Sequence, residues 1–127
     1  MRKIELLAPA RNCDTGIAAV NCGADAVYIG PEKFGARASA GNSLSDIERL
    51  ITYSHKYRAR VYATVNTILY DHELEDARRL IIGLYNAGID GIIFQDMSLL
   101  EMDIPQVPLH ASTQCDNYDI EKIKFFD

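Results

Sequence analysis

Short runs rich in aliphatic and β-branched residues alternate with longer amphipathic segments along this chain. The short runs predict strands at residues 4–9, 26–30, 61–66, 91–96 and 109–114. A strand, a helix and a second strand joined by short connections form a right-handed crossover, which makes the two strands parallel. This alternation restricts the chain to α/β folds that are built on a parallel sheet.

Capping residues indicate where the intervening helices begin and end. Ser45 and Glu48 have the spacing of a capping box, and Asp71 is the expected N-cap of the next helix. Gly23 and Gly88 stand where helices are expected to end in the left-handed conformation. Residues at helical spacing follow the two N-caps: Ile47, Leu50, Ile51 and Ser54, then Leu74, Ala77, Ile81, Leu84 and Tyr85.

The segment 22–30 resembles the segment 87–95, since each places a glycine, an aspartate and an apolar run in the same order. Their separation corresponds to two βα units. A chain of 127 residues is long enough for one core, so we expect a single α/β domain over residues 1–127.

The two faces of the expected strands differ in polarity. A doubly wound sheet carries helices on both faces, so its strands are almost continuously apolar. In a barrel, one strand face packs on the outer helices and the other faces the interior. Here one face is repeatedly polar or aromatic, at Tyr28, Tyr62, Thr64, Asn66, Gln95, His110, Ser112 and Gln114. We therefore predict parallel β/α units of a TIM-like barrel, incomplete at about five strands; a flavodoxin-like sheet is the alternative.

Composition limits the location and the partners of the chain. No apolar run approaches the ~18 residues of a membrane span, so no membrane partner is expected. The three cysteines lack a C-x-x-C spacing, which argues against a disulfide framework or a zinc site and favours the cytoplasm. The net charge of −5 gives no general attraction for nucleic acid, although residues 31–60 are locally basic.

In both parallel architectures, ligands bind at the carboxyl ends of the strands. His110 and Ser112 are two residues apart on a strand, so we expect them to point the same way, with Cβ atoms about 6–7 Å apart. Such a pair suits a proton relay, or metal ligation beside Asp96 or Glu5; the plainer interpretation is a hydrogen-bonded interior histidine. The candidate catalytic residues are His110, Ser112 and Asp96, and the candidate substrate-binding residues are Tyr28, Arg37, Asn66, Gln95 and Gln114.

Two of the charged residues carry specific expectations. Arg37 lies in the long loop 31–44, where it would clamp a carboxylate or phosphate, or else be a surface arginine of a flexible loop. Glu5 interrupts an apolar strand, so we expect it to pair with Arg60 or with an interior tyrosine.

Several motifs in order resemble the amino-terminal part of the peptidase U32 family. They are Glu5-Leu6-Leu7-Ala8-Pro9-Ala10, residues 23–30, 34–38, 65–67 and 95–96, and His110-Ala111-Ser112-Thr113-Gln114. The resemblance implies a TIM-like barrel and a collagenase-like protease. Other members of the family hydroxylate tRNA or ribosomal RNA bases, using prephenate, or hydroxylate ubiquinone precursors.

The resemblance also bears on cofactors and chain length. Several family members hold an iron–sulfur cluster with four cysteines beyond the matched span, and Cys13, Cys22 and Cys115 are not at those positions. No cofactor is therefore expected in this chain. A helix expected at 117–127 would precede a sixth strand, so we expect a fragment of a longer barrel.

Four functions follow as hypotheses. The first is a U32 protease acting on peptides, and the second is prephenate-dependent hydroxylation of an RNA base. The third is a non-catalytic half barrel that self-associates through its open sheet edges. The fourth is a metal-dependent hydrolase that uses Glu5, Asp96 and His110.

Overall fold

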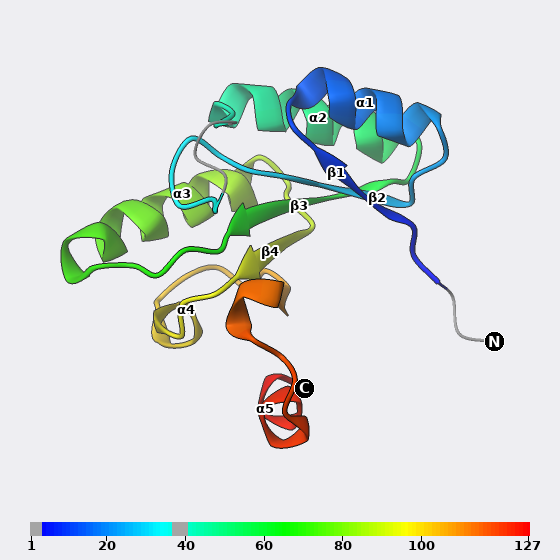
Figure 1. Cartoon of the computed structure of the whole chain (residues 1–127). Coiled ribbons are helices and arrows are strands. Elements are labelled where there is room, and N and C mark those ends of the chain that lie inside the picture. The colour runs from blue at the N-terminus through cyan, green and yellow to red at the C-terminus, as the bar shows by residue number, and fades with distance from the viewer. Residues whose placement is uncertain (1–3, 37–40) are drawn as a thin grey trace.

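The computed structural model describes residues 4–36 and 41–127, and its centre is a sheet of parallel strands (Figure 1). Neighbouring strands pair in chain order, from β1 to β5. The strands are β1 (Leu7–Ala10), β2 (Ala26–Ile29), β3 (Arg60–Val65), β4 (Gly91–Phe94) and β5 (Leu109–Ala111). Parallel register joins every adjacent pair.

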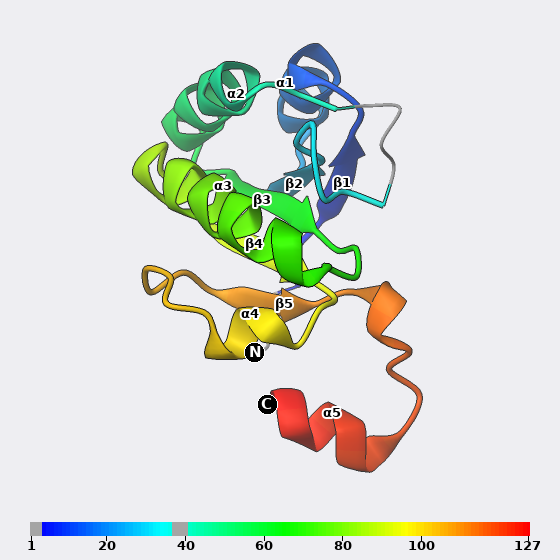
Figure 2. The ribbon, with the colours of Figure 1, turned by 90° about the vertical axis from the view of Figure 1, so that its left-hand side faces the viewer.

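Three helices cover one side of this sheet (Figure 2): α1 (Cys13–Asn21), α2 (Leu44–Lys56) and α3 (Leu74–Asn86). The chain also forms α4 (Ser98–Glu101) and α5 (Ile120–Phe126), and short 3₁₀ turns η2 (Asp71–Glu73) and η3 (Thr113–Cys115). Figure 2 shows α1, α2 and α3 following one another on the same side of the strands. Among the described residues, no helix combines the length and the apolar character needed to cross a membrane.

This arrangement confirms the prediction of barrel-type β/α units in an open sheet. A doubly wound sheet reverses its strand order at a switch point and carries helices on both faces. Here the order is sequential and the three long helices share one side. The flavodoxin-like alternative is therefore wrong.

The strand faces differ in burial as the sequence pattern predicts. The face beneath the helices is 2% exposed or less at Val27, Ile29, Val61, Ala63, Val65, Ile92 and Phe94. On the other face, Tyr62 is buried, Tyr28, Thr64 and Ile93 are half-buried, and His110 is exposed. Burying one face of each strand supplies most of the hydrophobic stabilisation, and the other face remains available for polar groups.

The internal repeat has a structural counterpart. Gly23 and Gly88 both have positive φ, 97° and 89°, which confirms that they end helices in the left-handed region. The aspartate that follows each glycine then binds a neighbouring strand: Asp25 Oδ2 accepts from Leu6 N at 2.9 Å, and Asp90 Oδ2 accepts from Val61 N at 2.7 Å. In both copies of the motif, a glycine thus ends a helix and the aspartate that follows accepts a hydrogen bond from a backbone N–H of the neighbouring segment.

Two predicted helix starts are wrong by one to three residues. α2 is capped by Ser43, whose Oγ accepts from Asp46 N at 3.1 Å, so Ser45 and Glu48 lie inside the helix. Asp71 begins the 3₁₀ turn η2, and α3 starts three residues later at Leu74. The sequence contains several polar residues able to cap these helices, and local backbone geometry selects among them.

Three strand boundaries differ from the prediction by two or more residues. β1 begins at Leu7, not at residue 4, and β4 ends at Phe94, not at residue 96. β5 ends at Ala111, because Ser112 caps η3 and accepts from Gln114 N at 3.2 Å. Ser112 and Gln114 have therefore left the strand on which His110 lies.

Candidate functional site

Asn66 lies at the centre of a polar cluster at the carboxyl ends of the strands. Its Oδ1 accepts a hydrogen bond from Ala36 N at 3.0 Å, and its Nδ2 donates to Ser112 Oγ at 3.3 Å. Ala36 belongs to the loop after β2, and Ser112 follows β5. One amide thus joins loops from two separate strands across the end of β3.

Ser112 holds together the loop that follows β5. It is 3% exposed, and its backbone N donates to Phe94 O at 2.8 Å. Asn117 Nδ2 donates to Ser112 O at 2.9 Å, and Gln95 Nε2 donates to Gln114 O at 3.3 Å. The structure therefore brings together four of the predicted site residues: Asn66, Gln95, Ser112 and Gln114.

Asp96 uses its carboxylate to connect two loops. Oδ2 accepts from Leu69 N at 2.8 Å, and Oδ1 accepts from Ser98 N at 2.9 Å. Burial raises the pKa of Asp96, but the hydrogen bonds from Leu69 and Ser98 outweigh it, and the net pKa lies below the ordinary value. Asp96 is thus charged at neutral pH and fixes the loops after β3 and β4.

His110 lies beside Tyr62 and Gly91. Its ring centroid lies 5.0 Å from that of Tyr62, and a Cβ added at Gly91 would meet His110 Nε2 at 2.9 Å. His110 contacts Tyr62 and Ser112 contacts Asn66, and the common direction of His110 and Ser112 stays a prediction. Their catalytic roles stay predictions.

The environment of Glu5 agrees with both partners proposed for it. Tyr62 OH donates to Glu5 Oε2 at 3.0 Å, and Arg60 Nη1 lies 3.3 Å from the same oxygen. Burial, and to a lesser extent the Glu5 carboxylate, raise the pKa of Tyr62 above its ordinary value, against the opposing effect of Arg60. These residues and His110 form a second polar group on the open sheet face, nearer the amino ends of the strands.

Two predicted binding residues remain, and one of them lies within the described residues. Tyr28 is half-buried on the open face, in register with Pro9 of β1 and Tyr62 of β3. Arg37 lies outside the described residues, and its proposed carboxylate clamp stays a prediction.

Sequence reasoning missed the asparagine that closes the base of the loop after β2. Asn42 is 7% exposed, and its Nδ2 donates to Gly30 O at 2.9 Å and to Arg11 O at 3.1 Å. It thereby ties the loop after β1 to the loop after β2. Its position after Gly41 was the available signal, since asparagine beside glycine is typical of tight turns.

The described residues do not bring together a metal-ligating group. Cys13 and Cys115 are buried, and Cys22 is exposed. No three cysteine, histidine, aspartate or glutamate side chains in 4–36 and 41–127 lie together as metal ligands, the proposed Glu5, Asp96 and His110 set included. These three cysteines do not fit an iron–sulfur cluster.

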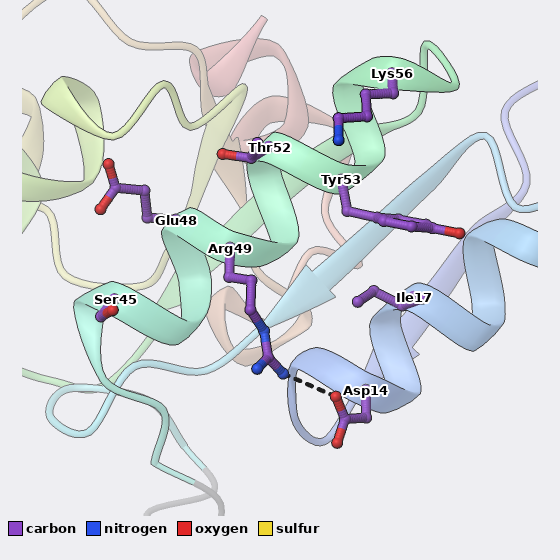
Figure 3. Close-up of a pocket in the computed structure, with 8 residues that line it drawn as sticks. All are labelled: Asp14, Ile17, Ser45, Glu48, Arg49, Thr52, Tyr53 and Lys56. Carbon is purple, nitrogen blue, oxygen red and sulfur yellow. Dashed lines mark hydrogen bonds and ion pairs between the residues drawn. The ribbon is translucent and has the colours of Figure 1, made fainter.

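A hollow on the outer surface lies between α1 and α2 (Figure 3). Arg49 Nη2 of α2 forms an ion pair with Asp14 Oδ1 of α1 at 2.8 Å, and Tyr53 OH donates to Asn21 Oδ1 at 2.7 Å. This hollow is lined by α1 and α2, away from the carboxyl ends of the strands, and its Arg49 already pairs with Asp14. We therefore place the candidate site at the strand ends.

The cluster of Asn66, Gln95, Ser112 and Gln114 consists of three side-chain amides and one hydroxyl, all of which are uncharged. Asparagine and glutamine present donors and acceptors side by side, which suits the edge of a heterocycle or a carboxylate. Most of these groups are oriented by protein hydrogen bonds. The arrangement can therefore hold a small polar ligand in a defined orientation.

Comparison with known proteins relates this chain to RNA-modifying and protease-named relatives. It is 54% identical over 97% of its length to the 23S rRNA 5-hydroxycytidine C2501 synthase of Escherichia coli (strain K12), and covers 19% of that protein. It is 35% identical over 89% of its length to tRNA hydroxylation protein P1 of Bacillus subtilis (strain 168), covering 28% of it. The Collagenase of Porphyromonas gingivalis (strain ATCC BAA-308 / W83) is 30% identical over 96% of the chain, which covers 30% of that protein.

A solved structure supports the fold. The crystal structure of phosphonopyruvate hydrolase superposes on 98% of this chain with a TM-score of 0.65 and 18% identity, and the chain covers 51% of it. The chain thus spans less than a third of the three curated relatives and half of this structural neighbour. The model of peptidase family U32 matches residues 11–127, and the chain therefore belongs to peptidase family U32.

Proposed function

We propose that this chain is the part of an RNA-base hydroxylation enzyme that positions the base, with a ribosomal cytidine as the first candidate. The observation that carries the proposal is the 54% identity to the 23S rRNA 5-hydroxycytidine C2501 synthase over 97% of the chain. The relatives thus support the RNA-hydroxylation hypothesis better than the protease hypothesis.

The geometry of the strand-end cluster supports a base or a small acid as ligand. Amide groups at Asn66, Gln95 and Gln114 offer neutral hydrogen-bonding partners for a pyrimidine edge. A small polar acid such as prephenate would place its carboxylates near the loop that contains Arg37. Charge-assisted contacts from arginine to carboxylate are strong and directional.

A segment exchange tests this function. The residues of this chain replace the matched segment of the E. coli synthase, and the chimera is expressed in cells that lack the native enzyme. We expect 5-hydroxycytidine to reappear in 23S rRNA, measured by mass spectrometry of nuclease digests. The chain alone is expressed in parallel, which shows whether the matched segment suffices.

Two variants give the test a matched comparison. Asn66→Ala removes the amide at the centre of the cluster, whereas Thr52→Ala changes an exposed side chain on the outer face of α2. We expect the first to lower the 5-hydroxycytidine level at least about tenfold, and the second to leave it unchanged. A chimera that folds and accumulates but restores no modified base would refute the proposed function.

Proteolysis is the second candidate, favoured by the 30% identity to the P. gingivalis Collagenase. In the structure, Ser112 contacts Asn66, and His110 packs on Tyr62 and Gly91. Peptide cleavage that persists through stringent purification and disappears in His110→Ala would establish this candidate in place of RNA hydroxylation.

A self-associating half barrel is the third candidate. In the described sheet, β1 and β5 are the edge strands. Exposed strand edges favour pairing with another strand. Light scattering of the chain over a range of concentrations tests this, since a constant monomer mass at high concentration would contradict it.

A further inference from the structure

The loop after β3 presents two large side chains to solvent beside the candidate site. Ile68 is 68% exposed and Tyr70 is 69% exposed, although Leu69 between them is only 8% exposed. The loop begins at Asn66, and Figure 1 shows it extending from the β3 arrowhead to the start of α3. It therefore forms part of the rim around the strand-end cluster.

The backbone of this loop is held on both sides of Tyr70. Leu69 N donates to Asp96 Oδ2 at 2.8 Å, and Tyr70 N donates to Glu73 Oε2 at 2.9 Å. Glu73 N in turn donates to Tyr70 O at 2.8 Å. The exposure of Tyr70 is thus imposed by a fixed backbone, and replacing its side chain leaves these bonds in place.

The ring of Tyr70 is also oriented. Its centroid lies 5.8 Å from that of His72, with an angle of 12° between the two planes. His72 is itself exposed. A parallel pair of exposed rings offers a flat surface on which another planar group can stack, and proteins bind unpaired RNA bases on surfaces of this kind.

The charges around the pair favour a base over a phosphate. Asp71 and Glu73 flank His72 in the chain and carry negative charge. Phosphates of an RNA backbone are repelled by such carboxylates, whereas the face of a neutral base is not. The surface therefore suits the base of an unpaired nucleotide whose phosphates lie farther from the loop.

We propose that Tyr70 and His72 form a stacking platform for an unpaired RNA base that neighbours the base held at the strand ends. This inference rests on the proposed function and adds a contact that positions the RNA strand. It assigns His72 and Tyr70 to substrate binding and not to the chemical step.

The chain contains no tryptophan, which allows a direct optical test. Tyr70→Trp makes the platform the one source of tryptophan fluorescence in the full chain, and the probe is single-stranded pentacytidylate RNA. We expect stacking to quench this fluorescence in a saturable way. In competition with labelled pentacytidylate, we expect Tyr70→Ala to weaken binding at least about fivefold relative to the unmodified chain.

Tyr57→Trp is the matched control. Tyr57 is 61% exposed and caps the end of α2, on the amino side of β3 and so at the opposite end of the sheet. We expect pentacytidylate to leave its fluorescence unchanged. Equal quenching of both variants, no quenching of Tyr70→Trp, or equal quenching by a ribose-phosphate pentamer without bases would overturn the platform.

The chimera separates this inference from the proposed function. If the chimera hydroxylates 23S rRNA and Tyr70→Ala reduces the product at least fivefold, both stand. If Tyr70→Ala has no effect in an active chimera, the platform is refuted while RNA hydroxylation stands. If the chimera is inactive but pentacytidylate quenches Tyr70→Trp selectively, hydroxylation fails while base stacking stands.

Discussion

Asn66 Nδ2 donates to Ser112 Oγ at 3.3 Å, and this bond links residues that are 46 positions apart in the chain. The same side chain accepts from Ala36 N, 30 positions away in the other direction. Asn66 thus connects the loops after β2 and β5 at the end of β3. A residue with this many long-range partners is expected to position a site as well as to contact a ligand.

The Asn66–Ser112 contact predicts measurable coupling between the two residues. Asn66→Ala removes the hydrogen bonds to Ala36 N and Ser112 Oγ, and Ser112→Ala removes the Oγ bonds from Asn66 and from Gln114 N. We therefore expect each variant to lose about 2 kcal/mol in the free energy of unfolding. The double variant should lose less than the sum, by about 0.5–1 kcal/mol. Urea denaturation measures all three, and strict additivity would contradict a direct contact.

Asp96 predicts a pH-dependent contribution to stability. Its pKa is lower in the folded chain than the ordinary value, because hydrogen bonds from Leu69 and Ser98 outweigh the effect of burial. A lowered pKa stabilises the fold above about pH 4 and loses this effect as the pH falls through the folded value. Asp96→Asn should therefore cost about 1–2 kcal/mol at pH 7 and progressively less as the solution is acidified. Urea titrations at pH 7 and pH 3 would show whether the two proteins converge; a constant difference would argue against this role.

The location of His110 can be tested through Gly91. A methyl group at residue 91 would meet His110 Nε2 at 2.9 Å and Tyr62 Cδ1 at 3.1 Å. We expect Gly91→Ala to destabilise the chain by about 1 kcal/mol, because the His110 ring must move. In a His110→Ala background the same change should be neutral or stabilising, since alanine is better than glycine in a strand. An unchanged cost in that background would place the His110 ring elsewhere.

The repeated aspartates predict unequal losses at equivalent positions. Asp90 binds Val61 N at 2.7 Å and also His55 Nε2 at 2.8 Å, whereas the side chain of the exposed Asp25 accepts from Leu6 N at 2.9 Å. Asp90→Ala should cost about 1–3 kcal/mol, because it leaves a half-buried N–H without its acceptor, and Asp25→Ala should cost under about 1 kcal/mol. Thermal unfolding of both variants checks this order, and the reverse order would show that the two turns are not equivalent.

Local sequence patterns were sufficient for the regular elements. The apolar runs predicted all five strands, and glycine chemistry correctly placed the left-handed residues Gly23 and Gly88. The polar alternation on the strands predicted barrel-type β/α units, which the sequential strand order confirms. Such features depend on residues within a few positions of one another, so they can be predicted from the local sequence.

Helix starts and strand ends were less accurate for a physical reason. Ser43, Ser45 and Asp71 are all chemically able to cap a helix, and the choice depends on the backbone entering each turn. Likewise, nothing within the run His110 to Gln114 indicates that Ser112 turns the chain away from β5. β5 therefore ends at Ala111, three residues before the predicted end.

The sequence by itself determined the βα alternation, the one-sided burial of the strands and the motifs of peptidase family U32. The tertiary structure decided which polar residues meet: Asn66 with Ala36 and Ser112, Asp96 with Leu69, and His110 with Tyr62. These contacts join segments far apart in the chain, so they exist only after the parallel strands have brought their ends together. Their geometry is a property of the sheet and its loops, whereas the periodicity that builds the sheet is local and can be read residue by residue.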